Sequence, residues 1–90
     1  MYVICYDISN TKRRNKVFKK LKNYGKHMQL SVFECDIPEK QLKKLMKELE
    51  KIMGDEEDWS ILIYSLCERC REKMILLGRI EDDGDVVIIG

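Results

Sequence analysis

The first segment of the chain shows the twofold alternation of a β-strand. Residues 2–7 are mostly β-branched or aromatic, which predicts a strand at this position. Successive side chains of a strand point to opposite faces of its sheet. The two predicted faces carry Val3, Cys5 and Asp7 on one side and Tyr2, Ile4 and Tyr6 on the other.

Two later segments show the helical period instead. Ser9, Asn10 and Thr11 supply side chains that commonly cap helices, and they predict a helix over about residues 11–23 that ends before Gly25. Its apolar side consists of Val17, Phe18, Leu21 and Tyr24. A second helix is predicted to begin at Pro38, because proline fits the first helical turn. Its apolar residues recur at the amphipathic spacing and are Leu42, Leu45, Met46, Leu49, Ile52 and Met53.

The remaining segments predict further strands. Residues 27–35 read as one strand, in which Met28, Leu30 and Val32 alternate with Gln29, Ser31 and Phe33. After an acidic loop over 54–58, residues 59–66 are apolar enough for a central strand, with Trp59 in the core. A polar turn over 67–72, a strand over 73–78, a turn over 82–85 and a last strand over 86–89 complete the chain.

This order of elements predicts an α+β fold. The expected architecture is a ferredoxin-like βαββαβ sandwich, with an antiparallel sheet and two helices on one face. We expect one domain over residues 1–90, with a core over 1–78 and a C-terminal turn and strand over 79–90. An exposed apolar end strand favours pairing with another chain, and a core this small favours a homodimer.

The composition of the chain predicts its cellular compartment and the chemical state of its cysteines. The chain is 44% hydrophobic and 37% charged, and it has no apolar run near the about 20 residues of a membrane helix. It shows no basic leader, so we expect a cytoplasmic protein without membrane contact and with reduced cysteines. Cys67 and Cys70 have the spacing of half a zinc site, but two thiols on one turn are the favoured interpretation because no second such pair follows.

Charge is segregated although the net charge is only +1. The segment from Ile8 to Phe33 has eight cations and no acid, whereas residues 34–90 have a balance of −6. A basic face indicates a polyanionic partner, although a solvated helix surface gives the same pattern. Arg13, Arg14 and Lys16 fall in the first turns of the first helix, where free backbone N–H groups also favour a phosphate.

Asp7 is the sharpest candidate for chemistry. It can cap the following helix, which is favoured on the residues alone, or it can bind a metal at the end of the strand. Magnesium typically takes one or two carboxylates plus water and substrate phosphate. No second acid lies near Asp7 in the chain, but a two-fold axis would bring two copies of Asp7 together.

Two aromatic side chains leave alternatives open. Phe33 is expected to plug a dimer interface or to stack on a base, with the interface favoured. His27 is more consistent with a surface or phosphate-contacting residue than with a general base.

Several motifs together resemble a known family. They are YDIS at 6–9, Arg13-Arg14, Gly25 and above all QLSVFE at 29–34, with SILIYSL at 60–66 and CERC at 67–70 also fitting. Over about residues 1–78 the chain resembles the small CRISPR-associated adaptation protein, the smaller partner of the CRISPR integrase. The resemblance implies a ferredoxin-like homodimer whose C-terminal strand packs on the partner subunit. It also implies a metal-dependent endonuclease, using Mg²⁺ or Mn²⁺, which in some members cuts RNA or DNA.

The resemblance also assigns roles to particular residues. It places the catalytic and metal-binding aspartate at Asp7, with Tyr6 and Ser9 beside it in the same motif, a helix arginine at Arg14 and an interface phenylalanine at Phe33. Family members often have arginine after the glycine that ends the first helix, where this chain has Lys26-His27. Two functions are therefore expected. One is a magnesium-dependent endonuclease acting in spacer acquisition with the integrase. The alternative is a non-catalytic homodimeric scaffold that binds duplex DNA and bridges integrase dimers.

Overall fold

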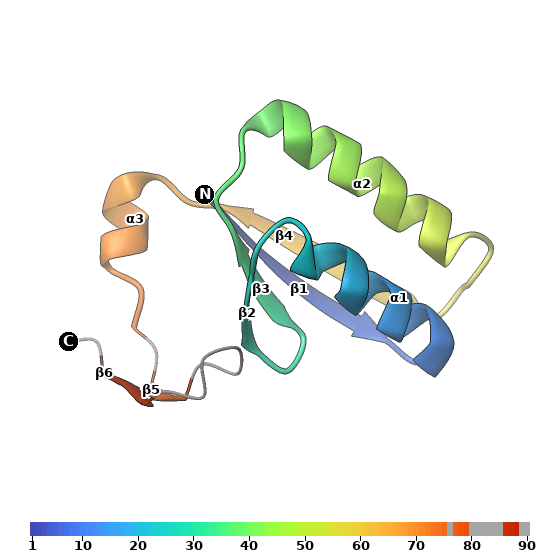
Figure 1. The fold of residues 1–90 in the computed structure, drawn as a ribbon, viewed down its shortest axis with the longest axis horizontal. Helices are drawn as coiled ribbons and strands as arrows, with labels where there is room; N and C mark the ends of the chain where they lie inside the picture. The colour runs from blue at the N-terminus through green and yellow to red at the C-terminus, as the bar shows by residue number, and fades with distance from the viewer. Residues whose placement is uncertain (76, 80–85, 89–90) are drawn as a thin grey trace.

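A four-stranded antiparallel sheet covered by two helices forms the body of the molecule (Figure 1). The computed structural model describes residues 1–75, 77–79 and 86–88. Its first elements are β1 (Tyr2–Ile8), α1 (Thr11–Lys22), β2 (Lys26–Gln29), β3 (Val32–Cys35), α2 (Glu39–Met53) and β4 (Trp59–Ser65). The strand order is β2-β3-β1-β4, and α1 and α2 lie on the same side of the sheet. This arrangement confirms the predicted ferredoxin-like βαββαβ sandwich.

The C-terminal part lies beyond this sandwich. It consists of α3 (Glu68–Glu72), β5 (Leu77–Arg79) and β6 (Val86–Ile88), and β5 and β6 form a separate antiparallel pair. In Figure 1, α3 and the β5–β6 pair lie to one side of the main sheet, with α3 near the chain's N-terminus. The predicted polar turn over 67–72 is therefore wrong, because a short helix occupies most of it. The predicted strand over 73–78 is also wrong at its start, because β5 begins at Leu77.

Two further predictions concern the C-terminal part of the chain. The last predicted strand is found as β6, and the turn predicted over 82–85 lies outside the described residues. The division into a core over 1–78 and an appendage over 79–90 stays a prediction. Among the described residues, no helix has both the length and the apolar composition needed to cross a membrane.

The core lies between the sheet and the two helices. The predicted faces of β1 are confirmed, since Ile4, Tyr6 and Ile8 are buried under the helices and Asp7 is exposed on the opposite face, called here the open face. The helical period is confirmed as well, because the buried helix residues are Val17, Leu21, Leu42, Leu45, Leu49 and Met53. Gly25 fits where α1 ends against β3, since a Cβ there would lie 2.4 Å from the Glu34 carbonyl oxygen.

The prediction of one strand over 27–35 is wrong, because the chain reverses at Leu30 and Ser31. Leu30 has a φ of 28°, a left-handed conformation that costs free energy for a side chain with a Cβ. Contacts on both sides of the turn hold it in place. A ring nitrogen of His27 lies 2.7 Å from the Leu30 carbonyl oxygen, and the Tyr6 N–H donates to the Ser31 carbonyl at 3.0 Å.

The prediction that residues 59–66 form a central strand is wrong as well. β4 is an edge strand that pairs only with β1 in the four-stranded sheet. Trp59, Ile61 and Ile63 pack against the core, so the prediction for Trp59 is close to what is found. The alternate residues Leu62 and Tyr64 are 55% and 53% exposed, respectively. The strand is thus apolar on both faces, although the described residues leave Leu62 and Tyr64 on one of them exposed.

Candidate metal and nucleic-acid site

Asp7 lies one residue before the end of β1, on the open face. Its partner in the neighbouring strand is Ser60 of β4, which is also exposed. Directly opposite residues of antiparallel strands have neighbouring side chains on one face, so the Ser60 hydroxyl lies beside Asp7. Within the described part of the chain, the Asp7 carboxylate makes no hydrogen bond and no ion pair. Sequence reasoning missed Ser60, because only the strand register brings it beside Asp7.

The interpretation of Asp7 as a helix cap is wrong. The N-cap of α1 is Asn10, whose side-chain oxygen accepts a hydrogen bond from the Arg13 N–H at 3.0 Å. The amide nitrogen of the same Asn10 donates to Glu56 at 3.0 Å, which joins the helix start to the loop after α2. Asp7 is therefore not needed to begin the helix.

The donor chemistry of Asp7 fits part of a magnesium shell. An exposed carboxylate is the hard oxygen ligand that Mg²⁺ prefers, and the ion fills its other positions with water and phosphate. Among residues 1–75, 77–79 and 86–88, no group of three or more His, Cys, Asp or Glu side chains could hold a metal. Asp7 is thus not part of a preformed cluster of three ligands within the described residues.

Tyr6 and Ser9 flank Asp7 but face other parts of the molecule. Tyr6 is 7% exposed in the core, where burial raises the pKa of its hydroxyl and the nearby charge of Arg14 lowers it in part. The Ser9 hydroxyl donates to Asp58 at 3.1 Å. Both residues thus fix the end of β1, and the prediction that they support chemistry at Asp7 stays a prediction.

The three cationic side chains in the first turns of α1, Arg13, Arg14 and Lys16, have different neighbours. The Arg13 guanidinium donates to the carbonyl oxygens of Ile52 (3.0 Å) and Met53 at the end of α2. It also lies 3.4 Å from both Asp55 and Glu56, and its side chain is only 29% exposed. Arg13 therefore joins α1 to α2, and these contacts leave it poorly placed to bind a phosphate.

Arg14 and Lys16 are exposed, but they do not lie together. Arg14 lies close enough to Tyr6 to change the pKa of that residue, at the end of the sheet that carries Asp7. Lys16 lines a groove between α1 and α2 on the helix side of the molecule, called here the basic groove. The residues that line it are Lys16, Lys19, Lys20, Asn23, Glu48, Lys51 and Ile52. Lys20 is paired with Glu48 at 2.7 Å, so part of the positive charge in this groove is neutralised.

The predictions for Phe33 are wrong. Its side chain is fully buried, and its ring contacts Phe18 (centroids 5.5 Å apart) and His27 (4.9 Å). A ring inside the core can neither stack on a base nor plug an interface. His27 belongs to the same aromatic cluster, which agrees better with a structural role than with a general base.

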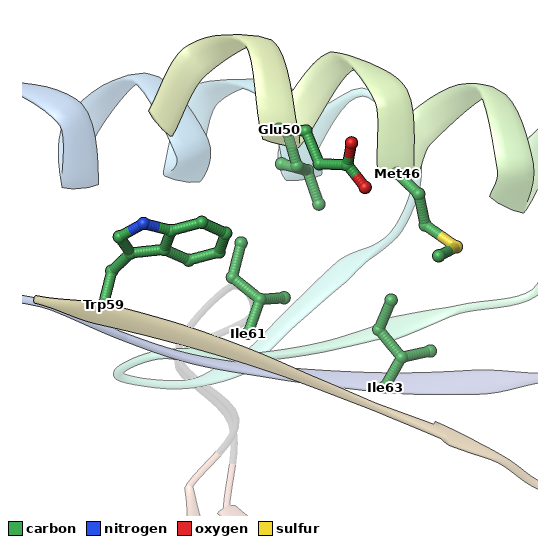
Figure 2. Close-up of a pocket in the computed structure, with 6 residues that line it drawn as sticks. Met46, Glu50, Trp59, Ile61 and Ile63 are labelled. Carbon is green, nitrogen blue, oxygen red and sulfur yellow. The ribbon is translucent and has the colours of Figure 1, made fainter. Parts of the chain in front are cut away.

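An apolar groove, called here the edge groove, lies between α2 and the edge strand β4. Figure 2 shows side chains of α2 and β4 that converge on a groove beside the edge strand. Its lining residues are Met46, Leu49, Glu50, Trp59, Ile61 and Ile63. The prediction of a central strand concealed this edge groove, because the sequence pattern does not show which neighbours a strand has.

The protein is a small ferredoxin-like domain with an exposed aspartate, Asp7, near the end of its first strand. Comparison of the sequence with known protein families identifies the family to which the chain belongs. The model of the family described as CRISPR associated protein Cas2 matches residues 1–74, and the chain belongs to this family.

Relatives and solved structures agree with this assignment. The chain is 42% identical over 77 residues to "CRISPR-associated endoribonuclease Cas2 1" of Chloroflexus aurantiacus, covering 86% of this chain and 83% of the relative. It is 39% identical to "CRISPR-associated endoribonuclease Cas2 2" of Methanospirillum hungatei, covering 97% and 96%. Streptococcus pyogenes Cas2 superposes with a TM-score of 0.74 at 31% identity, over 86% of this chain and 98% of that one. A chain of a structure described as "Partial Cas6-RT-Cas1--Cas2 complex" gives 0.67 at 27% identity, over 96% and 93%.

The contacts of Arg13 predict a stability defect. Replacing Arg13 with Gln removes the ion pairs and leaves the last carbonyl oxygens of α2 without their guanidinium donor. We expect the free energy of unfolding to fall by about 1–2 kcal/mol, measured by urea denaturation. Arg14→Gln is the matched control, because Arg14 is exposed, and it should leave the midpoint almost unchanged. Equal midpoints for the two variants would contradict the assigned role of Arg13.

Proposed function

We propose that this chain is a metal-dependent endonuclease of CRISPR adaptation that cuts phosphodiester bonds in single-stranded RNA or in DNA. The observation that carries the proposal is the placement of Asp7, an exposed carboxylate without a partner among the described residues, on a rigid central strand. The names of the relatives from Chloroflexus and Methanospirillum, both called endoribonucleases, support the same activity.

The chain's own residues would hold the reacting groups in place. Asp7 would bind Mg²⁺ or Mn²⁺, and the paired backbones of β1 and β4 would fix its direction. The Ser60 hydroxyl opposite Asp7 offers a hydrogen bond to a water molecule or a phosphate oxygen at the same spot. A bound divalent ion would polarise the phosphodiester and lower the pKa of a water molecule.

The proposed active form is a homodimer, because among the described residues of one chain no cluster of three metal-ligating side chains surrounds Asp7. The open face carries the exposed side chains Leu62 and Tyr64 and the half-buried Val3, Cys5 and Val32. Two open faces packed together would remove this apolar surface from water and bring both copies of Asp7 to one interface. The unpaired edge of β4 and its edge groove would accept the apolar C-terminal strand of the partner subunit.

The role of Asp7 predicts the outcome of a conservative substitution. Asp7→Asn keeps the size of the side chain but removes its charge, so cleavage should fall by about 100-fold or more, the scale of removing one electrostatic interaction at a reacting group. The measurement is cleavage of labelled single-stranded RNA and duplex DNA with Mg²⁺, with Mn²⁺ and with chelator. Asp58→Asn is the control, because this exposed carboxylate lies at the same end of the sheet. Unchanged cleavage by Asp7→Asn, with the dimer intact, would rule out the proposed nuclease.

The proposed interface predicts a coupled loss of assembly and cleavage. Leu62→Lys places a charge in the middle of the open face, where burial in an interface would be costly. Sedimentation should show a monomer at concentrations where the wild type is dimeric, and cleavage should fall although Asp7 is present. Gln41→Lys adds the same charge on exposed α2 and should remain dimeric. A dimeric Leu62→Lys variant would exclude the open face as the interface.

A second function is favoured by the location of the cations. Arg14 and the basic groove provide positive charge away from the buried core, and the solved complex that contains Cas1 and Cas2 supports an integrase partner. We propose that the homodimer also serves as a scaffold that binds the phosphates of duplex DNA and bridges integrase dimers. This role needs no chemistry at Asp7.

The scaffold function predicts a strong effect of charge reversal. The double change Arg14→Glu and Lys16→Glu should weaken duplex DNA binding and reduce the salt slope by about 1 for each phosphate that the variant no longer binds. Spacer acquisition should fail in this variant but survive in Asp7→Asn. Lys40→Glu with Lys47→Glu on α2 makes the same change in net charge and serves as the control. Acquisition that survives reversal of Arg14 and Lys16 would exclude these residues as the site of DNA binding.

A further inference from the structure

Two of the four cysteines form a close, accessible pair at the start of α3. Cys67 and Cys70 are both exposed, and their sulfur atoms lie 3.4 Å apart in hydrogen-bond contact. They are three residues apart on one helical turn, a spacing that puts two side chains on the same side of a helix. Neither the nuclease nor the scaffold described above uses these thiols.

The four thiols differ in their reactivity. Burial raises the pKa of Cys5, and burial together with the charge of Glu34 raises the pKa of Cys35 to about 11, so both favour the unreactive thiol form. A hydrogen bond from the Cys70 backbone N–H to the Cys67 sulfur, together with the hydrogen-bond contact between the two thiols, lowers the pKa of Cys67. The same interaction with Cys67 raises the pKa of Cys70. Cys67 is thus the thiol better suited to attack a disulfide, and Cys70 can then act as the resolving thiol.

The geometry points to Cys67 and Cys70 as a reversible dithiol–disulfide site that exchanges with low-molecular-weight disulfides. Closing the bond requires the two sulfur atoms to move from 3.4 Å to about 2.05 Å, within one turn of an exposed helix. A zinc site is the weaker use of the pair, since zinc prefers four ligands and the described residues offer no cluster of three.

Thiol–disulfide exchange between the protein and a small disulfide, RSSR, takes two steps. The Cys67 thiolate attacks one sulfur of a disulfide RSSR, forms a mixed disulfide and releases RS⁻, which takes up the proton that Cys67 had released. Cys70 then releases its proton and attacks the Cys67 sulfur, which expels the second RS⁻ and gives a second RSH. Two protein thiols are thereby oxidised to one disulfide, while RSSR is reduced to two RSH molecules.

The position of the pair links its oxidation state to the C-terminal segment. Arg71 of α3 lies 3.2 Å from Glu34 and 3.8 Å from Asp36, which holds the helix against the end of β3. The chain after α3 then runs onto the open face, where Met74, Ile75 and Leu77 line a hollow together with Val3, Met28, Gln29, Val32 and Glu34. A disulfide would restrain the turn from which this segment starts.

The test is oxidation of the intact protein with excess glutathione disulfide. We expect the mass to fall by two hydrogen atoms and peptide mapping to find the Cys67–Cys70 bond, with Cys5 and Cys35 still reduced and alkylated by N-ethylmaleimide once the oxidised protein is unfolded. Glutathione should reverse the change. Absence of this bond, or oxidation of Cys5 or Cys35 at an equal rate, would overturn the proposal.

Single serine variants test the order of attack without disturbing the core. Cys70→Ser should trap a mixed disulfide with glutathione at Cys67 at least about threefold faster, at pH 7, than Cys67→Ser traps one at Cys70. Equal or reversed rates would overturn the assignment of Cys67 as the attacking thiol. Circular dichroism checks that both variants are folded, and oxidation of Asp7→Asn separates this result from the nuclease proposal.

Hydrogen exchange tests the link to α3. The Arg71 N–H bonds to the Cys67 carbonyl at 2.9 Å, and the Lys73 N–H bonds to the Cys70 carbonyl at 3.2 Å. Both amides should exchange several-fold more slowly in the disulfide form, because the turn that accepts their hydrogen bonds is restrained. Equal exchange in the two forms would show that the disulfide does not restrain the segment.

Discussion

The alternation of β1 is the constraint on which the rest of the structure depends. β1 pairs on both sides, with β3 and β4, so every second side chain must enter the core and the others must face outward. Ile4, Tyr6 and Ile8 take the core positions, which leaves Asp7 on the open face. A slip of one residue would bury the carboxylate without a partner, at a cost of several kcal/mol. Core packing and the position of the candidate site therefore have one cause.

Part of the basic segment serves the fold rather than a ligand. Arg13 binds the last carbonyl oxygens of α2 and two acids of the following loop, and Asn10 binds the same loop through Glu56. The opposite charges of the first helix and of the acidic loop thus meet in a structural contact. A count of cations along the sequence includes these residues, so it overstates the charge available to a nucleic acid.

The elements with strong local periodicity were predictable from the sequence, and the pairing of strands was not. The two helices and the two faces of β1 follow from side-chain spacing within each segment. The turn at Leu30 and Ser31 has no glycine, proline or asparagine, and alternation continues across it, so the sequence pattern conceals the reversal. Phe33 faces the core because its partner in the register of β3 with β1 is Ile4, a buried residue, and the sequence pattern does not reveal that pairing.

The candidate site was predictable only in part for the same reason. Asp7 is found from its position at the end of an apolar strand, whereas Ser60 and the edge groove depend on which strands are neighbours. The cap interpretation of Asp7 rested on a common pattern that Asn10 fulfils instead. Contacts between distant segments, such as those of Arg13, have no signature in local spacing.

An isolated carboxylate on an apolar face makes the proposed assembly and the proposed chemistry interdependent. Packing two open faces together gains hydrophobic free energy from residues such as Leu62 and Tyr64, but it also brings two like charges toward each other. A divalent cation between the two Asp7 carboxylates would remove that repulsion. Metal binding would then stabilise the dimer through mass action, and the dimer in turn would complete the metal site. In the proposed dimer, a domain of this size could leave Leu62 and Tyr64 exposed in one chain, because the second copy would supply both the missing apolar contacts and a second carboxylate.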